Sequence, residues 1–298
     1  MNRLNVKTAL IALCMLTASP AVHAEHWFIE NTALTNTHKL FLEGDSQRGF
    51  QSLIEVWQQL PSISQQQHLD KLINSVIELD CGRSFKQIGI PEWLDGVTIE
   101  RQSIQSPGRL SHKVIVRANT PQDLDRIRLI RWPDVEVINE SSPDRSDGVE
   151  SKYQYSATTE TLNTRAKSGL YKIQVVSDSK LEWETWVILA EPHNKELVRW
   201  SSKQKWTTYK SGLLNKYCPL PTLDLSLHTN KDSKFHKVWT EQYEGDYPIE
   251  LPKMTLPDDR YVLAVSLKHR RWQGSITILD TQTITKTIDL STELFTER

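Results

Sequence analysis

The residue types that most often carry catalysis are present in this sequence, but their spacing assembles no recognised catalytic motif. The nine His residues are scattered, without the His-Glu-x-x-His pair or the closely spaced Cys and His residues that bind zinc. The glycines do not fall at the spacing of a nucleophile elbow, a phosphate-binding loop or a dinucleotide-binding turn. We therefore expect no catalytic residues, no metal and no cofactor.

Two groups of carboxylates are the remaining candidates for chemistry. Asp144, Asp147 and Glu150 lie in an expected polar loop at 141–150 and could converge on calcium. They do not match an EF-hand loop, so a solvated turn is the simpler interpretation. Glu182 and Glu184 could do acid–base work if burial separated their pKa values. Their alternation with an apolar Trp favours a solvent-facing pair instead.

Tryptophan is the excess of this composition, with 10 residues in the chain. Exposed Trp side chains on a β-sheet can stack on sugar rings, whereas buried ones fill a sandwich core. Trp183 and Trp272 are expected in cores. Trp186 lies on the opposite face of its strand from Trp183, where it is either exposed or covered by a neighbouring module. Trp206 follows an expected linker at 191–196, where the alternative to exposure is a seal between the two sandwiches. Trp186 and Trp206 are therefore the candidate glycan-binding residues.

The N-terminus has the three parts of a secretory signal peptide, with cleavage expected before Glu25. A basic start precedes an apolar run that is too short to span a membrane, and small residues follow it. The residues behind this prediction are Arg3, Lys7, the run from Ala9 to Leu16, Val22 and Ala24. We expect a periplasmic or secreted protein with no membrane span after cleavage.

Of the three Cys residues, Cys14 leaves with the signal peptide. Cys81 and Cys218 form an even pair in an exported protein, which favours a disulfide. In the chain-entropy model such a long closed loop is worth roughly 4–5 kcal/mol. The alternative is a free nucleophilic or metal-binding thiol.

The charge balance argues against nucleic acid and anionic membranes as partners. Removing Arg3 and Lys7 leaves 36 − 2 = 34 basic residues against 37 acidic ones. A net charge near −3 gives no electrostatic basis for binding nucleic acid or an anionic membrane surface.

The period of the apolar residues divides the chain. From Thr35 to Cys81 they recur at helical spacing, and from about Gly89 they alternate. We predict an α+β, mainly β, multi-domain chain in which a small helical unit precedes two immunoglobulin-like β-sandwiches. The expected divisions are 1–24 (signal peptide), 25–87 (helical domain), 88–192 (β-sandwich 1) and 193–298 (β-sandwich 2).

Two similar hairpins support the two sandwiches. Each opens with a tyrosine after a turn, Tyr171 and Tyr261, and this placement resembles the tyrosine corner of immunoglobulin-like folds. The expected tip of the second hairpin is basic and consists of Lys268, His269, Arg270 and Arg271. We interpret it as a candidate partner surface, with a solvated loop as the alternative.

Taken whole, the chain resembles an uncharacterised family of exported gamma-proteobacterial proteins, a domain of unknown function. The resemblance is carried by Asp80-Cys81-Gly82-Arg83-Ser84, by the helical opening Leu34-Thr-Asn-Thr-His38 and by the Trp-containing late hairpin. Members of that family are often encoded beside a histidine kinase and response regulator pair concerned with the cell envelope. The resemblance implies an accessory envelope role and supplies no catalytic residues.

We therefore expect a non-enzymatic periplasmic protein that acts in envelope stress sensing or signalling through a protein partner, for example the periplasmic domain of a sensor kinase. One alternative is a glycan- or peptidoglycan-binding module that uses exposed Trp side chains. Another is an unrecognised envelope hydrolase, which would need a deep acidic cleft between modules.

Overall fold

The structure is a computed structural model, and it describes residues 32–85, 89–147, 153–191, 198–202, 205–209, 217–231, 234–254 and 256–290. The expected signal peptide, most of the expected linker at 191–196 and Glu150 lie outside these ranges.

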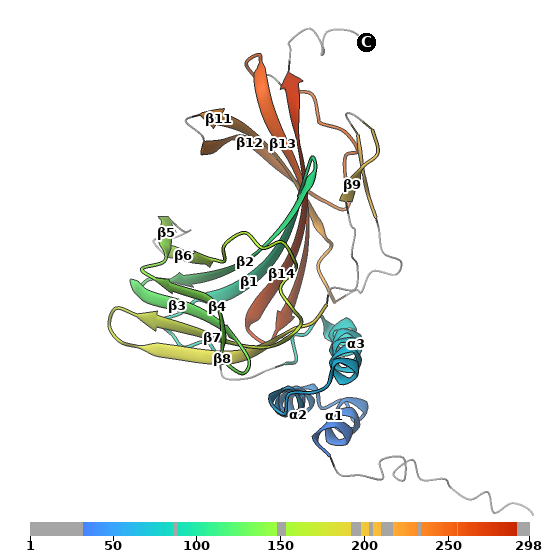
Figure 1. The fold of residues 1–298 in the computed structure, drawn as a ribbon, viewed down its shortest axis with the longest axis vertical. Coiled ribbons are helices and arrows are strands. Elements are labelled where there is room, and N and C mark those ends of the chain that lie inside the picture. The colour runs from blue at the N-terminus through green and yellow to red at the C-terminus, as the bar shows by residue number, and fades with distance from the viewer. Residues whose placement is uncertain are drawn as a thin grey trace, which may run out of the picture.

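Three helices open the described chain: α1 (Ala33–Leu42), α2 (Ser46–Gln58) and α3 (Ile63–Asp80). Thr32 and Ser62 close capping boxes at the starts of α1 and α3, and Asp45 caps α2, so each helix starts at a residue that satisfies its first N–H groups. The apolar faces of the helices pack together and against β-strand residues, among them Leu170 and Ile188. The expected helical unit is confirmed (Figure 1).

The largest sheet of the described β region has eight strands, in the order β12-β11-β13-β14-β1-β2-β6-β5. Its β1–β14 pair is parallel and its other pairs are antiparallel. The strands are β1 (Gly96–Ser106), β2 (Arg109–Thr120), β5 (Asp144–Asp147), β6 (Tyr153–Thr158), β11 (Thr222–Lys231), β12 (Lys234–Glu244), β13 (Asp259–Gln273) and β14 (Ile276–Leu290). Strand β5 lies in the segment expected to be a polar loop, because its backbone pairs with β6.

Two smaller sheets cover the large one. The four-stranded sheet β4-β3-β7-β8 packs on the half that contains β1, β2 and β6 and encloses one apolar core. The ribbon of β9 and β10 packs on the half that contains β11 and β13 and helps to enclose another. These strands are β3 (Leu124–Arg131), β4 (Val135–Ser141), β7 (Gly169–Ser177), β8 (Glu182–Leu189), β9 (Val198–Trp200) and β10 (Trp206–Thr208).

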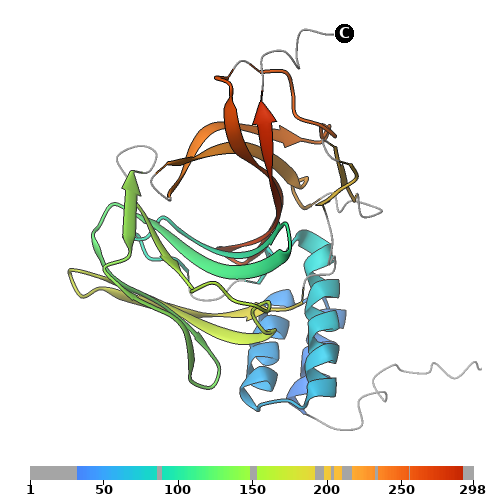
Figure 2. The same ribbon diagram turned by 45° about the horizontal axis from the view of Figure 1, so that its top comes forward.

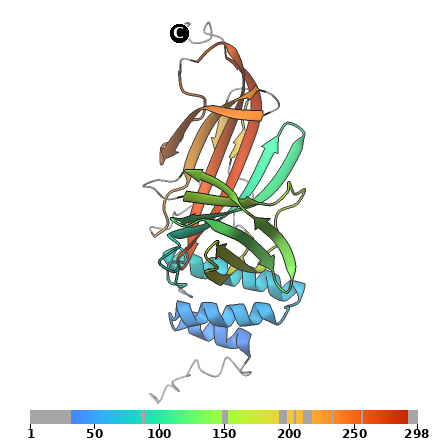
Figure 3. The same ribbon diagram turned by 90° about the vertical axis from the view of Figure 1, so that its left-hand side faces the viewer.

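The expected fold class, mainly β with a helical unit followed by sandwich layers, is confirmed. The two sandwiches share a sheet, however, because β13 and β14 run through both (Figure 3). Ile276 and Ile278 of β14 are buried in the first core, whereas Ile284 of the same strand is buried in the second. The expected boundary at 192/193 stays a prediction, and the last hairpin contributes to both sides of it.

Both tyrosine corners are present. The Tyr171 hydroxyl donates a 2.5 Å hydrogen bond to the Lys167 carbonyl, and the Tyr261 hydroxyl donates a 2.8 Å bond to the Pro257 carbonyl. In each case the acceptor lies four residues earlier, so the hydroxyl fixes the turn that leads into the strand.

The prediction that residues 268–271 form the tip of the second hairpin is wrong. Lys268, His269, Arg270 and Arg271 lie within β13, and the chain turns only at Gly274, whose φ is positive. Lys268 forms an ion pair with Asp224 of β11, and Arg271 forms one with Asp280 of β14. These carboxylates neutralise Lys268 and Arg271, and main-chain pairing with β14 continues the strand to Gln273.

Candidate functional site

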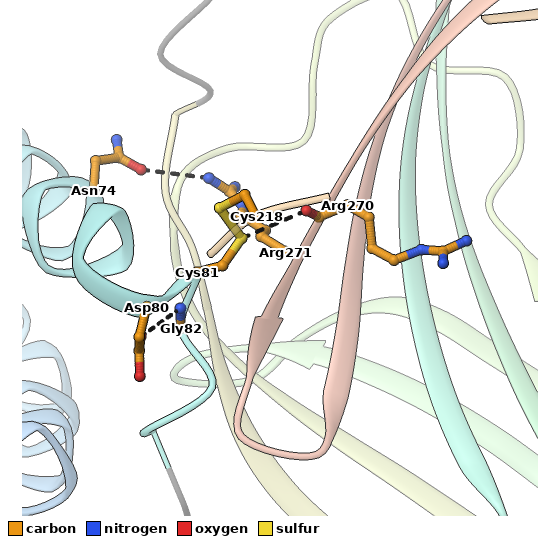
Figure 4. Close-up of a disulfide and its surroundings, with 7 residues drawn as sticks. All are labelled: Asn74, Asp80, Cys81, Gly82, Cys218, Arg270 and Arg271. Atoms are coloured by element: carbon orange, nitrogen blue, oxygen red, sulfur yellow. Dashed lines mark hydrogen bonds between the residues drawn. A yellow bond between two sulfur atoms is a disulfide. The ribbon is translucent and has the colours of Figure 1, made fainter. Parts of the chain in front are cut away.

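A disulfide joins the helical unit to the last part of the chain (Figure 4). It links Cys81 to Cys218, with the two Cα atoms 5.2 Å apart, and confirms the expected pairing. Such a bond persists in an oxidising compartment, so the chain belongs outside the cytoplasm.

The sequence around Cys81 ends helix α3 in a tight turn. Cys81 is the C-cap and has a positive φ of 62°. The Asp80 carboxylate accepts hydrogen bonds from the backbone N–H groups of Gly82 (2.9 Å) and Ser84 (2.8 Å). The carboxylate therefore fixes the backbone conformation of the turn through these two hydrogen bonds.

This turn is hydrogen-bonded to the end of the β13–β14 hairpin. The N–H of Trp272 donates to the Cys81 carbonyl at 2.9 Å, and the N–H of Gly274 donates to the Gly82 carbonyl at 3.0 Å. The Arg83 guanidinium lies 3.7 Å from the centre of the Trp272 ring, within the range of a cation–π contact. The Asp-Cys-Gly-Arg-Ser segment thus serves as a clamp between the helices and the large sheet.

A cavity of about 750 Å³ opens where the helical unit meets the sheets. We call it the junction cavity, and its size is that of ordinary small-molecule sites. Its walls come from α2 and α3, from β1, β2 and β14, from the end of β3 and from the loop before β7, a region shown from two sides in Figures 1 and 2. The lining residues with polar or aromatic side chains include Trp57, Gln66, Gln67, Asp70, Arg101, His112, Lys113, Arg131, Trp132, Arg165, Lys167, Glu191 and Asp280.

A buried ion cluster forms one wall of the junction cavity. Asp280 accepts a 2.7 Å hydrogen bond from Arg101 Nε and lies 3.1 Å from Arg271 Nη2. Burial alone would raise the pKa of Asp280, but the two guanidinium groups hold it below its usual value. Asp280 is therefore a carboxylate already committed to two cations.

Asp70 and Trp57 also line the junction cavity, and both are nearly buried. Asp70 is 9% exposed and Trp57 is 4% exposed. Burial raises the pKa of Asp70, although Ser168 and the Glu191 backbone bond to its carboxylate. Asp70 Oδ1 and Trp57 Nε1 have no hydrogen-bond partner among the described residues. Buried polar atoms without partners are uncommon, and here both belong to residues that line the cavity, although the two atoms themselves are covered.

The cavity carries more positive than negative charge. Its basic side chains are Arg101, Lys113, Arg131, Arg165 and Lys167, and its carboxylates are Asp70, Glu191 and Asp280. Within the described parts of the chain, no carboxylate pairs with Lys113, Arg131 or Lys167.

The rim of the cavity is apolar where α2 passes into α3. Leu60 is 62% exposed and Ile63 is 76% exposed, and both line the cavity. Leu60 has a positive φ of 55° just after the end of α2, a position that favours glycine. Neither backbone preference nor burial explains a leucine there.

The structure separates the residues expected to bind a glycan or a partner. Trp206 is 0% exposed, and its ring packs against Trp200 with centroids 6.1 Å apart, so it cannot stack on a sugar. Trp186 is half-buried and packs edge-on against Trp132 beneath the helical unit. The basic residues expected at a hairpin tip lie in β13 instead. Burial lowers the pKa of His269 there, and of the four residues only Arg270 is well exposed.

Of the two carboxylate groups of the sequence, Asp144, Glu182 and Glu184 do not line the cavity, and Glu150 lies outside the described residues. Glu182 and Glu184 are exposed, as expected, and Glu184 accepts a 2.6 Å hydrogen bond from Gln174 Nε2. In the described ranges, no group of three or more His, Cys, Asp or Glu side chains is placed to hold a metal ion. The cavity residues come from segments far apart in the chain, so no local motif pointed to them.

Three comparisons relate the chain to known proteins. A family model described as "Protein of unknown function (DUF2861)" matches residues 27–289. No curated protein matches the chain. A solved structure titled "Structures of Clostridium thermocellum CbhA fibronectin(III)-like modules" aligns over 63% of this chain and 92% of its own, with 10% identity and a TM-score of 0.20. So low a score carries no argument about fold or function. No helix among the described residues is long and apolar enough to cross a membrane.

Proposed function

The chain belongs to the DUF2861 family of proteins of unknown function, and we propose that it is a non-enzymatic binding protein of the periplasm that holds a small ligand in the junction cavity. The observation that carries the proposal is the cavity itself, lined by Asp70 and Trp57, each with a buried polar atom that has no partner among the described residues. A binding site needs such concavity and a few convergent polar groups.

The build of the molecule supports this role. The clamp around Cys81 and the Cys81–Cys218 disulfide tie α3 to the large sheet, and both elements line the cavity. The walls are therefore fixed relative to one another before a ligand arrives, which lowers the entropic cost of binding.

We further propose that the protein acts in envelope stress sensing or signalling together with a protein partner, and our candidate is the periplasmic domain of a sensor kinase. The resemblance to exported gamma-proteobacterial proteins encoded beside a two-component system supports this part. Crosslinking in the periplasm tests it, and we expect a kinase adduct in at least one envelope-stress condition. Failure to recover any specific partner under such conditions would count against it.

A hydrolase is the second candidate, and one observation favours it: burial raises the pKa of Asp70 beside Glu191. A buried carboxyl group with a raised pKa next to an exposed carboxylate is the arrangement of a general acid and a general base. Against it, basic side chains outnumber carboxylates in the cavity, and Asp280 is already paired.

Affinity selection tests the proposed function. The mature protein is incubated with the small-molecule fraction of a periplasmic extract, and retained compounds are identified by mass spectrometry. Two variants on α3 are compared with the wild type. Gln67→Trp places a large side chain in the cavity, whereas Ser75→Trp changes an exposed residue of the same helix outside it.

We expect a compound that is retained by the wild type and by Ser75→Trp and lost with Gln67→Trp. Equal retention by all three proteins, or no enriched compound with the wild type, would contradict the proposal. Conversion of the retained compound, abolished by Asp70→Asn, would show the hydrolase instead.

A further inference from the structure

The inference rests on the proposed function and names the ligand class. We propose that the junction cavity binds a saccharide that carries a carboxylate, such as a uronic or muramic acid unit. Three features of the wall lead to this class: two cations, Lys113 and Arg131, with no carboxylate partner among the described residues, buried polar atoms with no hydrogen-bond partner among them, and aromatic and amide side chains.

The cations call for a negative group on the ligand. Arg101 and Asp280 form an ion pair, so each of these two charges already has a counter-ion. Lys113 and Arg131 line the same cavity, are only half exposed, and have no carboxylate partner in the described ranges. A half-buried cation without a counter-ion is unfavourable, and a ligand carboxylate would supply the missing charge in the planar form that an arginine binds through two hydrogen bonds.

The buried polar atoms call for hydroxyl groups. Asp70 Oδ1 can accept a hydrogen bond and Trp57 Nε1 can only donate one. Both atoms are covered in the structure, so a ligand bonds to them only after a neighbouring side chain shifts, and it must then offer both a donor and an acceptor. A sugar hydroxyl does both, whereas a fatty acid has no donor for Asp70 once it is ionised.

The rest of the wall suits a sugar ring. Gln67 and Gln102 line the cavity with amide groups that can donate and accept, whereas Gln66 and Gln282, which also line it, already bond to Pro61 and Val198. Trp132 provides an aromatic surface, and its Nε1 is already bonded to the Gln58 carbonyl at 3.1 Å, so its ring contributes apolar contact. The exposed Leu60 at the rim adds an apolar contact for the same ring or its acyl substituent.

A carboxylate and a phosphate monoester share the negative charge that the wall calls for. Basic side chains outnumber carboxylates in the cavity and attract either group. The test therefore includes inorganic phosphate as a competitor.

Isothermal titration at pH 7 with two matched pairs of disaccharides tests the inference. The first pair is N-acetylglucosaminyl-N-acetylmuramic acid and diacetylchitobiose, which differ by the 3-O-lactyl group that carries the carboxylate. The second pair is cellobiouronic acid and cellobiose, which differ by one carboxylate. We expect at least one acidic member to bind about tenfold or more tightly than its neutral partner.

Variants locate the charge contact. Arg131→Gln should weaken binding of the acidic disaccharide about tenfold and leave the neutral one little changed. Arg126→Gln is the matched control, because Arg126 lies on the same strand β3, is exposed and does not line the cavity. Asp70→Asn should weaken binding of both members of a pair, because it alters the hydroxyl contact.

Two results would overturn the inference: neither acidic disaccharide binds, or neutral and acidic members bind equally and Arg131→Gln has no effect. If affinity selection retrieves a neutral compound that Gln67→Trp loses, the proposed binding function stands and the carboxylate class fails. If inorganic phosphate alone competes as strongly as the acidic disaccharide, the site is a simple anion site and the saccharide class fails.

Discussion

At the scale of single residues, Leu60 ties backbone conformation to function. It is exposed, has a positive φ and lines the junction cavity. Glycine adopts this conformation without the side-chain strain that leucine experiences. We predict that Leu60→Gly stabilises the protein by about 0.5–1 kcal/mol in urea unfolding and weakens ligand binding. Loss of stability in this variant would show that the leucine serves the fold rather than the site.

Gly82 is the residue least free to change in the clamp. Its φ is +78°, and a Cβ there would lie 1.9 Å from the Trp272 carbonyl oxygen. We predict that Gly82→Ala destabilises the protein by about 2–4 kcal/mol, because the backbone strain and the clash add. Gly108 has a similar φ of +73° with nothing near its Cβ position, so Gly108→Ala should show the conformational cost alone, about 1–2 kcal/mol. Equal costs in the two variants would contradict a clash at the clamp.

The sequence predicted single residues well where their role is local. The two tyrosine corners follow from a short pattern, and the Cys81–Cys218 pair follows from a count of two. Trp206 could not be placed, because its burial depends on β9 and on strands distant in sequence. The charged run at 268–271 resembled a loop because its partners, Asp224 and Asp280, are remote in sequence.

At the scale of elements, a histidine pair joins α1 to α3. His38 Nε2 and His68 Nε2 lie 2.9 Å apart, so one ring donates and the other accepts. Burial, and secondarily the charge of His68, lower the pKa of His38 in the folded protein. The unfolded chain therefore binds more protons in this window, so this stability is present above about pH 6.5 and is lost as pH falls through the lowered pKa.

We predict that the melting temperature falls between pH 7.5 and pH 5, and that His68→Gln reduces the pH dependence. A glutamine can still bond to His38 but carries no charge when His38 is protonated. Burial also lowers the pKa of His112 and His228, so part of the dependence remains in the variant. An unchanged pH profile in His68→Gln would contradict the role of the pair.

Element types were predictable, but their partners were not. The change from helical period to alternation located the helices and most strands. The parallel pairing of β1 with β14 joins residues about 180 positions apart in the sequence, for example Val97 with Ile276, and no local pattern encodes it. The junction cavity has the same origin, since helices, three strands of one sheet and a loop all contribute to it.

At the scale of the whole molecule, β14 makes the two sandwiches interdependent. It supplies the parallel partner of β1 and places Ile276 and Ile278 in the first core. We predict that a fragment of residues 25–192 does not fold, because it exposes the edge of β1 and lacks this part of its core. Circular dichroism and dispersed amide NMR signals measure this against the full mature chain. A cooperatively folded fragment would contradict interdependence and support independent domains.

The central claim is that a ligand occupies the junction cavity, and amide hydrogen exchange tests it most directly. The mature protein is compared with and without the acidic disaccharide that binds it in the titration, N-acetylglucosaminyl-N-acetylmuramic acid or cellobiouronic acid. We predict slower exchange in the segments that line the cavity, at residues 60–70 and 165–170, and no change in β9 and β10. Unchanged exchange in both cavity segments, or protection confined to β9 and β10, would contradict the claim.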